Sequence, residues 1–187
     1  MLDGSFLGFL LPPFRARIVD ESGKDAPTGV AGELWISGPG LLEGYVGDAR
    51  ATGDVRVGRW VKTGAVAIRD RLGLIHFVDR KKDVIKSGGY SIYPAEIERV
   101  LSEHEAVALA VAFGLPHPTK GETPVAVVTL EPGATATGEA LESFARQHLS
   151  DYKAPRKVFV ILADEIPYGP TRKVLRTELA ERFAKSS

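Results

Sequence analysis

The sequence predicts an α+β fold in which a β-rich segment precedes a smaller segment of mixed strands and helices. Short alternating stretches that end in turn residues fill the first 79 positions, as in "GELWISG" at 32–38. Beyond position 83, apolar stripes at helical spacing interleave with strand-like apolar runs. The charged stretch "DRKKD", 79–83, lies between the two textures and is a plausible linker. We therefore expect domains at 1–79 and 83–187, joined by residues 80–82.

The first domain is expected to form an antiparallel sheet or a partial barrel. Strands are predicted in "RARIVDESG", in "GELWISG" and, two or three times, in "GRWVKTGAVAIRDRLGLIHFVDR", with a turn at Asp70–Gly73. The opening "MLDGSFLGFLLPP" has no basic start and is too short to span a bilayer. We interpret it as a buried strand or a packed arm. Trp35 and Trp60 are expected to be core or rim aromatics.

The second domain is expected to begin with a helix in "YPAEIERVLSEH". Pro94 suits a first helical position, and Ile97, Val100 and Leu101 form an apolar stripe. Further along, strands are predicted in "AVALAVAFGLP", "TPVAVVTLEPG" and "RKVFVILADEIP", and helices in "GEALESFARQHLSDY" and "LRTELAERFAKS". Together they predict a small α+β domain.

Composition narrows the possible partners. Lys+Arg and Asp+Glu are equal, at 24 each, in 187 residues, so the charge balance gives no reason to expect nucleic acid or a membrane surface as a partner. The absence of cysteine excludes thiolate metal sites and suits a cytoplasmic protein. The four histidines show no metal-ligand spacing, and we expect no metal site in this chain. Glu96 and Lys173 are the one charge pair worth testing for contact.

Four motifs occur in order along the chain: "GELWISGPGLLEGY", "VKTGAVAIRD", "DRKKDVIKSGGYSIYPAEIE" and "LSDYKAPRKVFVILADEIPYGPTRKVLR". They resemble the GEL-x-I-x-G…GY motif, the TGD motif, the hinge with its glycine loop, and the closing T-G-K segment of the AMP-forming acyl-adenylating enzymes. That family includes acyl-CoA synthetases, luciferases and peptide-synthetase adenylation domains. A short glycine motif alone indicates only a tight hairpin with solvated lysines. The order of all four makes the resemblance specific.

The resemblance implies ATP-dependent acyl-CoA ligation in two steps. A carboxylate first attacks the α-phosphate of ATP to give acyl-AMP and pyrophosphate, and the thiol of CoA or of a carrier then displaces AMP. Between the steps the small C-terminal domain, a lid, turns about the hinge and presents a different face. ATP, AMP, CoA and magnesium are thus implied, although the family's magnesium ligands are absent from this chain.

Individual positions carry implied roles. Lys173 matches the adenylation lysine, whose ammonium offsets the negative charge that gathers when carboxylate and triphosphate meet. Lys82 matches the hinge position, and Arg80 matches a residue near the nucleotide ribose. The loop that faces the active site during thioester formation is matched by Lys86, Gly88, Gly89 and Tyr90. Taken singly, without the surrounding motif, Lys173 is better explained as a solvated lysine near a helix start.

Two positions depart from the family pattern. Ala65 stands where the aspartate of the TGD motif accepts hydrogen bonds from the ribose, and alanine cannot accept them. Arg172 stands where the T-G-K loop has glycine. If that position requires positive φ, arginine strains it by about 1–2 kcal/mol; alternatively, Arg172 is a second cation beside Lys173.

The family's phosphate loop, its adenine motif and its acyl pocket are missing, so the chain matches only the last β subdomain and the small domain. Two accounts remain open. The chain is the C-terminal part of an acyl-CoA synthetase, inactive alone and completed by an N-terminal half or a synthetase partner in trans. Alternatively, as Ala65 and Arg172 favour, it is a degenerate stand-alone module that docks on a synthetase, a carrier protein or a CoA-like ligand. The lack of a carrier domain after Ser187 favours a CoA ligase over a peptide-synthetase module.

Overall fold

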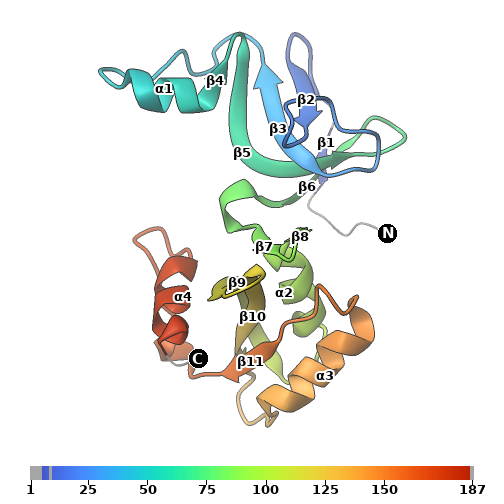
Figure 1. The fold of residues 1–187 in the computed structure, drawn as a ribbon, viewed down its shortest axis with the longest axis vertical. Coiled ribbons are helices and arrows are strands. Elements are labelled where there is room, and N and C mark those ends of the chain that lie inside the picture. Colours follow the sequence, from blue (N-terminus) through green and yellow to red (C-terminus); the bar gives the residue numbers. More distant parts are fainter. Residues whose placement is uncertain (1–5, 9, 186–187) are drawn as a thin grey trace. The chain divides into compact units, whose positions relative to one another are not determined.

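A computed structural model describes residues 6–8 and 10–185 (Figure 1). The chain divides into two compact units, Met1–Lys82 and Asp83–Ser187, which are called unit 1 and unit 2 below. Unit 1 is built mainly of strands, and unit 2 combines a sheet with three α-helices. The predicted α+β fold, with its β-rich part first, is therefore confirmed.

Unit 1 contains an open, antiparallel sheet with the order β1-β6-β5-β3-β2, and β4 pairs with β5. Its strands are β1 (Phe6–Gly8), β2 (Arg15–Val19), β3 (Gly32–Ser37), β4 (Arg56–Val57), β5 (Trp60–Arg69) and β6 (Ile75–Arg80). The long strand β5 is strongly curved (Figure 1). Among the described residues the two end strands, β1 and β2, do not pair with each other, so the expected partial barrel is a curved sheet that stays open.

The core of unit 1 lies on one face of this sheet and is formed by Ile18, Leu34, Ala67 and Ile75. The predicted turn between β5 and β6 is present: the backbone N–H of Gly73 donates to the carbonyl of Asp70 over 3.1 Å. Asp70 also lies 2.9 Å from His76 Nε2, and this hydrogen bond, with those from the turn backbone, holds the pKa of Asp70 below its ordinary value.

Two features of unit 1 differ from expectation. Residues 1–5 and 9 of the predicted buried arm lie outside the described residues, but 6–8 do form a strand, β1. Its side chains are not buried: Phe6 is 57% and Leu7 52% exposed, because β1 lies at the edge of the sheet. The second feature is an unpredicted helix, α1 (Ala49–Val55), which buries no residue and so has no apolar stripe to reveal it.

Unit 2 has a five-stranded sheet with the order β11-β10-β7-β8, and β9 pairs with β10. All its pairs are antiparallel except β10 with β11. The strands are β7 (Ile85–Ser87), β8 (Tyr90–Ile92), β9 (Val107–His117), β10 (Gly121–Leu130) and β11 (Lys157–Val160), and the helices are α2 (Pro94–Ser102), α3 (Gly138–His148) and α4 (Arg176–Ala184). Two 3₁₀ turns, Lys81–Asp83 and Ala163–Glu165, complete the order.

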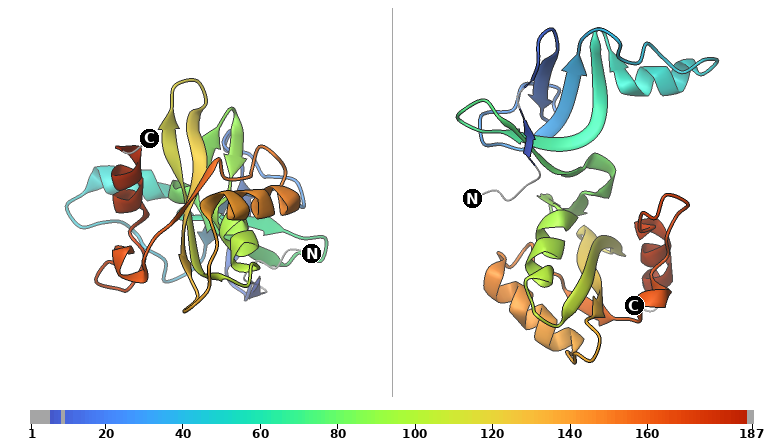
Figure 2. Two further views of the ribbon diagram at one scale, coloured as in Figure 1. Left: turned by 90° about the horizontal axis from the view of Figure 1, so that it is seen from below. Right: turned by 180° about the vertical axis from the view of Figure 1, so that it is seen from behind.

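Helices cover both faces of the sheet of unit 2, with α2 and α3 on one side and α4 on the other (Figure 2). The alternation along β10 shows this directly: Ala126 and Val128 belong to the core under α2 and α3, whereas Val125 and Val127 pack with Leu179 of α4. A sheet buried on both faces has strands that are apolar throughout. The apolar runs that predicted β9 and β10 follow from this arrangement.

Candidate functional site

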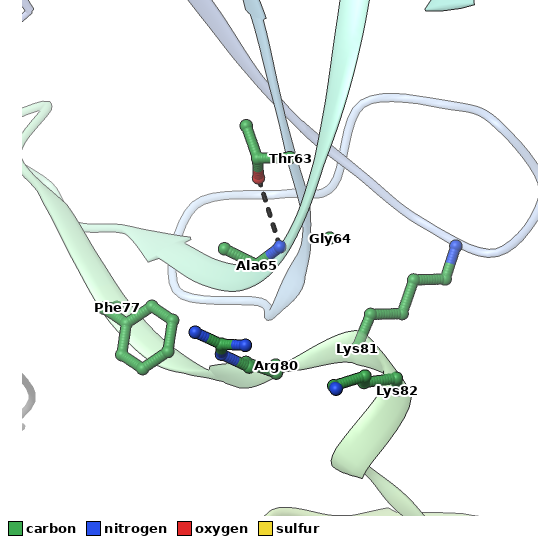
Figure 3. A pocket seen from close by; sticks show the side chains of 7 residues that line it. All are labelled: Thr63, Gly64, Ala65, Phe77, Arg80, Lys81 and Lys82. Atoms are coloured by element: carbon green, nitrogen blue, oxygen red, sulfur yellow. Dashed lines mark hydrogen bonds between the residues drawn. The ribbon is translucent and has the colours of Figure 1, made fainter. Parts of the chain in front are cut away.

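A surface depression of about 730 Å³ in unit 1 gathers three of the residues that the motifs single out. Its lining comes from the curved strand β5, from β6 and from the 3₁₀ turn, and consists of Thr63, Gly64, Ala65, Phe77, Arg80, Lys81 and Lys82 (Figure 3). The structure thus brings the degenerate TGD position and the predicted ribose and hinge positions together.

The backbone at the base of this depression is held in an unusual shape. Gly64 has φ +70°, a conformation that favours glycine. The Thr63 hydroxyl donates to the Leu34 carbonyl over 2.7 Å and accepts from the backbone N–H of Ala65 over 3.1 Å. Ala65 in turn lies opposite Arg80 in the β5–β6 register. The side chain at position 65 is therefore fixed beside a cation.

The polar groups of the depression are mainly cationic. Lys81 Nζ donates to Glu33 Oε2 over 2.9 Å and is thereby neutralised. Within the described part of unit 1, the exposed side chains of Arg80 and Lys82 make no hydrogen bond or ion pair. In Figure 3, Arg80 extends beneath Ala65 and Lys81 extends the other way. Two uncompensated cations suit an anionic ligand such as a phosphate ester, but Ala65 offers no acceptor to a sugar hydroxyl.

Lys173 lies in unit 2, on a hairpin loop just before α4. Tyr168 and Val174 form a β-bridge, and Leu175 N–H donates to the Pro167 carbonyl over 2.9 Å. Lys173 itself is exposed, and its ammonium contacts no hydrogen-bond or ion-pair partner among the residues described. An exposed lysine on a loop between two anchored ends is available to an incoming ligand.

Arg172 is the one described non-glycine residue with positive φ, at +57°. The loop explains the angle. Arg172 N–H donates to the Gly169 carbonyl over 2.9 Å, which closes a turn, and Gly169 N–H donates to the Lys173 carbonyl over 2.9 Å. In such a hairpin the residue after the turn takes the left-handed conformation that glycine adopts without penalty. From the sequence, strain is expected at Arg172 if this position has positive φ, and the structure shows that it does.

Replacing Arg172 by glycine is expected to stabilise unit 2 slightly. Relief of the left-handed strain is worth about 1–2 kcal/mol, and the extra freedom of glycine in the unfolded chain removes about 0.4–1 kcal/mol of that. The net gain in the free energy of unfolding, measured by urea denaturation, therefore lies between about 0 and about 1.6 kcal/mol. Arg172→Ala is the matched control, since it removes the charge and keeps the β-carbon. Equal stabilisation by alanine would show that charge, not strain, acts at this position.

The glycine loop forms the tight turn between β7 and β8. Gly88 and Gly89 have φ +57° and +84°, as a two-residue hairpin turn requires, and Ser87 pairs with Tyr90 across it. A β-carbon at either glycine would meet no atom within 4 Å, so this side of the loop is open. Tyr90 is 57% exposed. The simple interpretation as a hairpin is confirmed, and the open side leaves room for a ligand to pass.

The lysine side chains near this loop make hydrogen bonds within the protein and are not simply surrounded by solvent. Lys86 Nζ donates to Ser91 Oγ over 2.8 Å, and the Lys86 N–H donates to Glu122 Oε2 over 2.7 Å. Glu96, which we singled out for a contact with Lys173, instead accepts from Lys153 Nζ over 2.8 Å. Lys153 lies 57 positions away in sequence, so no local sequence pattern predicts this pair.

The described residues contain no group of three or more His, Asp and Glu side chains that would hold a metal ion. None of the helices in the described ranges is both long and apolar enough to cross a membrane. The candidate functional residues therefore lie in separate places: the depression within unit 1 and, within unit 2, the Gly88–Gly89 loop and the Lys173 loop.

Two family models match the chain: the "AMP-binding enzyme" model over residues 3–46 and the "AMP-binding enzyme C-terminal domain" model over residues 96–173. The second match ends on Lys173. A long-chain-fatty-acid–CoA ligase of Yersinia pestis is 37% identical over 179 residues, and a 4-coumarate–CoA ligase-like protein of Arabidopsis thaliana is 38% identical over 184. The chain belongs to the AMP-forming acyl-adenylating enzymes.

Two solved structures agree with the fold. ATP-bound MatB from Rhodopseudomonas palustris superposes with a TM-score of 0.88 at 30% identity, and the amide bond synthetase McbA from Marinactinospora thermotolerans with 0.86 at 35%. They cover 97% and 95% of this chain, whereas the chain covers 36% of each. The alignments with the two ligases include 96–97% of this chain but only 31–32% of the length of each ligase. The chain thus corresponds to the C-terminal part of an adenylating enzyme.

Proposed function

We propose that this chain acts as the C-terminal part of an AMP-forming acyl-CoA synthetase. The observation that carries the proposal is the match of nearly the whole chain to acyl-CoA ligases, with Lys173 presented on an exposed loop. In this function a carboxylate oxygen bonds to the α-phosphorus of ATP while pyrophosphate leaves. The sulfur of CoA then bonds to the acyl carbon while AMP leaves.

The residues described above take separate parts in these steps. Lys173 offsets the charge shared by the carboxylate and the phosphates during adenylation. Arg80, in the depression of unit 1, faces the ribose end of the nucleotide. The Gly88–Gly89 loop admits the thiol arm, since its outer side is open. In this proposal, magnesium and the acyl group are bound by the parts of a synthetase to which this chain does not correspond. A cytoplasmic location stays a prediction.

Lys82 is proposed as the hinge on which unit 2 turns. The boundary between the units falls directly after it, and it lies in a short 3₁₀ turn with an exposed side chain. If the two units move independently, trypsin is expected to cut after Arg80, Lys81 or Lys82 before any other site, as followed by mass spectrometry of the first fragments. Initial cleavage inside 90–170, with residues 80–82 protected, would instead indicate one fused domain.

The stand-alone binding module is the second candidate, and Ala65 and Arg172 are the observations in its favour. Both replace residues that the family's nucleotide chemistry uses. In this alternative the chain docks on a synthetase, on a carrier protein or on a CoA-like ligand and performs no chemistry.

A hybrid enzyme separates the two candidates. In this hybrid, the present chain replaces the matching C-terminal region of the Yersinia pestis ligase. Acyl-CoA formation is measured with a long-chain fatty acid, the substrate class in the name of that ligase. The isolated chain is expected to show no carboxylate-dependent exchange between pyrophosphate and ATP. The hybrid is expected to form acyl-CoA well above the level of the same ligase with the region deleted. A hybrid no better than the deletion would support the binding module.

A further inference from the structure

Arg176, the first residue of α4, joins three separate elements of unit 2. Its Nη2 donates to both carboxylate oxygens of Glu98, over 2.8 and 3.1 Å, and its Nη1 lies 3.8 Å from Asp83 Oδ2. Glu98 Oε1 also accepts from the backbone N–H of Ala112 in β9 over 2.9 Å. All three charged side chains are at most 31% exposed. We call Asp83, Glu98 and Arg176 the clamp.

The clamp connects the start of unit 2, next to the proposed hinge, with the loop that carries Lys173. The proposed reaction requires a fixed distance between these two places. Asp83 directly follows the proposed hinge residue Lys82. Arg176 lies three residues after Lys173, at the foot of the loop that carries it. Glu98, on α2, binds the guanidinium from the body of the domain and is itself tied to β9.

Backbone contacts of Val174 and Leu175 anchor the start of α4 to its own loop, but among the described residues no side-chain hydrogen bond or ion pair outside the clamp is seen there that ties it to α2 or to Asp83. The cap residue of α4, Leu175, makes no side-chain capping hydrogen bond, and the buried residues of this helix, Leu179 and Phe183, lie one and two turns further along. A cation in the first helical turn is also disfavoured by the helix dipole. Its partner Glu98 offsets this penalty, and Nη2 of the guanidinium is shared between the two oxygens of this carboxylate in charge-assisted hydrogen bonds.

We propose that Arg176 is a positioning residue, which holds the Lys173 loop to Asp83, the residue directly after the hinge, so that Lys173 is delivered in one fixed place when unit 2 turns. The inference rests on the proposed function where it assigns adenylation to Lys173. The thioester-forming step uses the Gly88–Gly89 loop, which the clamp does not touch. Loss of the clamp is therefore expected to affect one half-reaction and spare the other.

The first test uses the isolated chain and does not depend on activity. In Arg176→Gln and in Glu98→Gln, the backbone amides of residues 171–174 are expected to exchange with solvent about tenfold faster or more, with lower heteronuclear NOE values. Arg99→Gln is the matched control, since Arg99 forms an exposed pair with Glu103 on α2. If a clamp variant unfolds unit 2, Asp83→Asn provides the milder change. Loop amides unchanged in every folded variant would overturn the proposal.

The second test uses the hybrid enzyme and separates positioning from stability. Arg176→Gln is expected to slow acyl-AMP formation by about 100-fold, as displaced catalytic groups do. Its conversion of supplied acyl-AMP and CoA to thioester should match that of Arg99→Gln. Equal slowing of both half-reactions would mean that Arg176 only stabilises the fold, which contradicts the proposal. If the wild-type hybrid is inactive while the loop amides respond as expected, the proposed function fails and the clamp stands.

Discussion

Replacing Lys173 by alanine in the hybrid is expected to slow adenylation by about 100-fold or more, the loss typical of a preorganised charge-stabilising group. The structure supports this expectation because the ammonium is exposed and has no partner among the described residues, so its charge is available to a substrate. Pyrophosphate release during the first turnover is the measurement. Lys185→Ala, which removes an exposed lysine just after α4, is the control and should leave the rate unchanged. Equal rates for the two variants would mean that Lys173 is not a catalytic lysine.

Arg172, next to it, separates two interpretations by the sign of its effect. Arginine at φ +57° strains the loop, so glycine at this position should speed closure and adenylation if strain dominates. If instead Arg172 binds phosphate, the same change should slow the reaction. We expect the faster rate, because the loop's own hydrogen bonds impose the strained angle.

Restoring the missing carboxylate, by Ala65→Asp, is expected to tighten AMP binding by the hybrid. Position 65 lines the depression beside Arg80, where an acceptor can face the ribose hydroxyls. A hydrogen bond to a charged group contributes about 1.5–3 kcal/mol, which corresponds to about 10-fold to 150-fold in the dissociation constant. Isothermal titration with AMP measures it.

The controls for this prediction distinguish hydrogen bonding from other effects. Ala65→Asn supplies a neutral acceptor of the same size and should give a smaller gain, since a neutral hydrogen bond contributes about 0.5–1.5 kcal/mol. Ala65→Leu supplies none and should give no gain. Ala65 packs partly against the core of unit 1, so thermal unfolding of each variant is followed in parallel. An aspartate variant that binds AMP no better than the leucine variant would contradict the role assigned to this position.

The sequence predicts the folded elements well where burial leaves a strong pattern. The apolar runs of β9 and β10 and the stripe of Ile97, Val100 and Leu101 in α2 all reflect side chains in the core of unit 2. The pattern fails where nothing is buried: α1 has no core residue, and β1 exposes the side chains that its apolar letters suggested would be covered. Hydrophobic patterning reports burial and does not report backbone structure by itself.

The site is predicted where a motif is contiguous and missed where distant residues meet. The Gly88–Gly89 turn follows from local sequence, whereas strain at Arg172 is conditional on the resemblance to the T-G-K loop and becomes definite only with the observed φ of +57°. The partners of Glu96 and Glu98 do not follow from local sequence, because Lys153 and Arg176 lie 57 and 78 positions away. Such contacts depend on how three parts of unit 2 pack together: α2, α4 and the segment that follows α3. The pattern of a single sequence does not reveal this packing. The clamp is therefore a finding of the structure alone.

The decisive measurement compares the two half-reactions in one hybrid carrying either Lys173→Ala or Gly89→Ala. Acyl-AMP formation and thioester formation from supplied acyl-AMP are each followed in a single turnover. If the two loops serve separate steps, Lys173→Ala slows only the first, by about 100-fold or more, and Gly89→Ala slows only the second, by about tenfold or more. If Lys173→Ala leaves acyl-AMP formation unchanged, or if each variant slows both steps alike, the chain does not work as the catalytic C-terminal part of a synthetase.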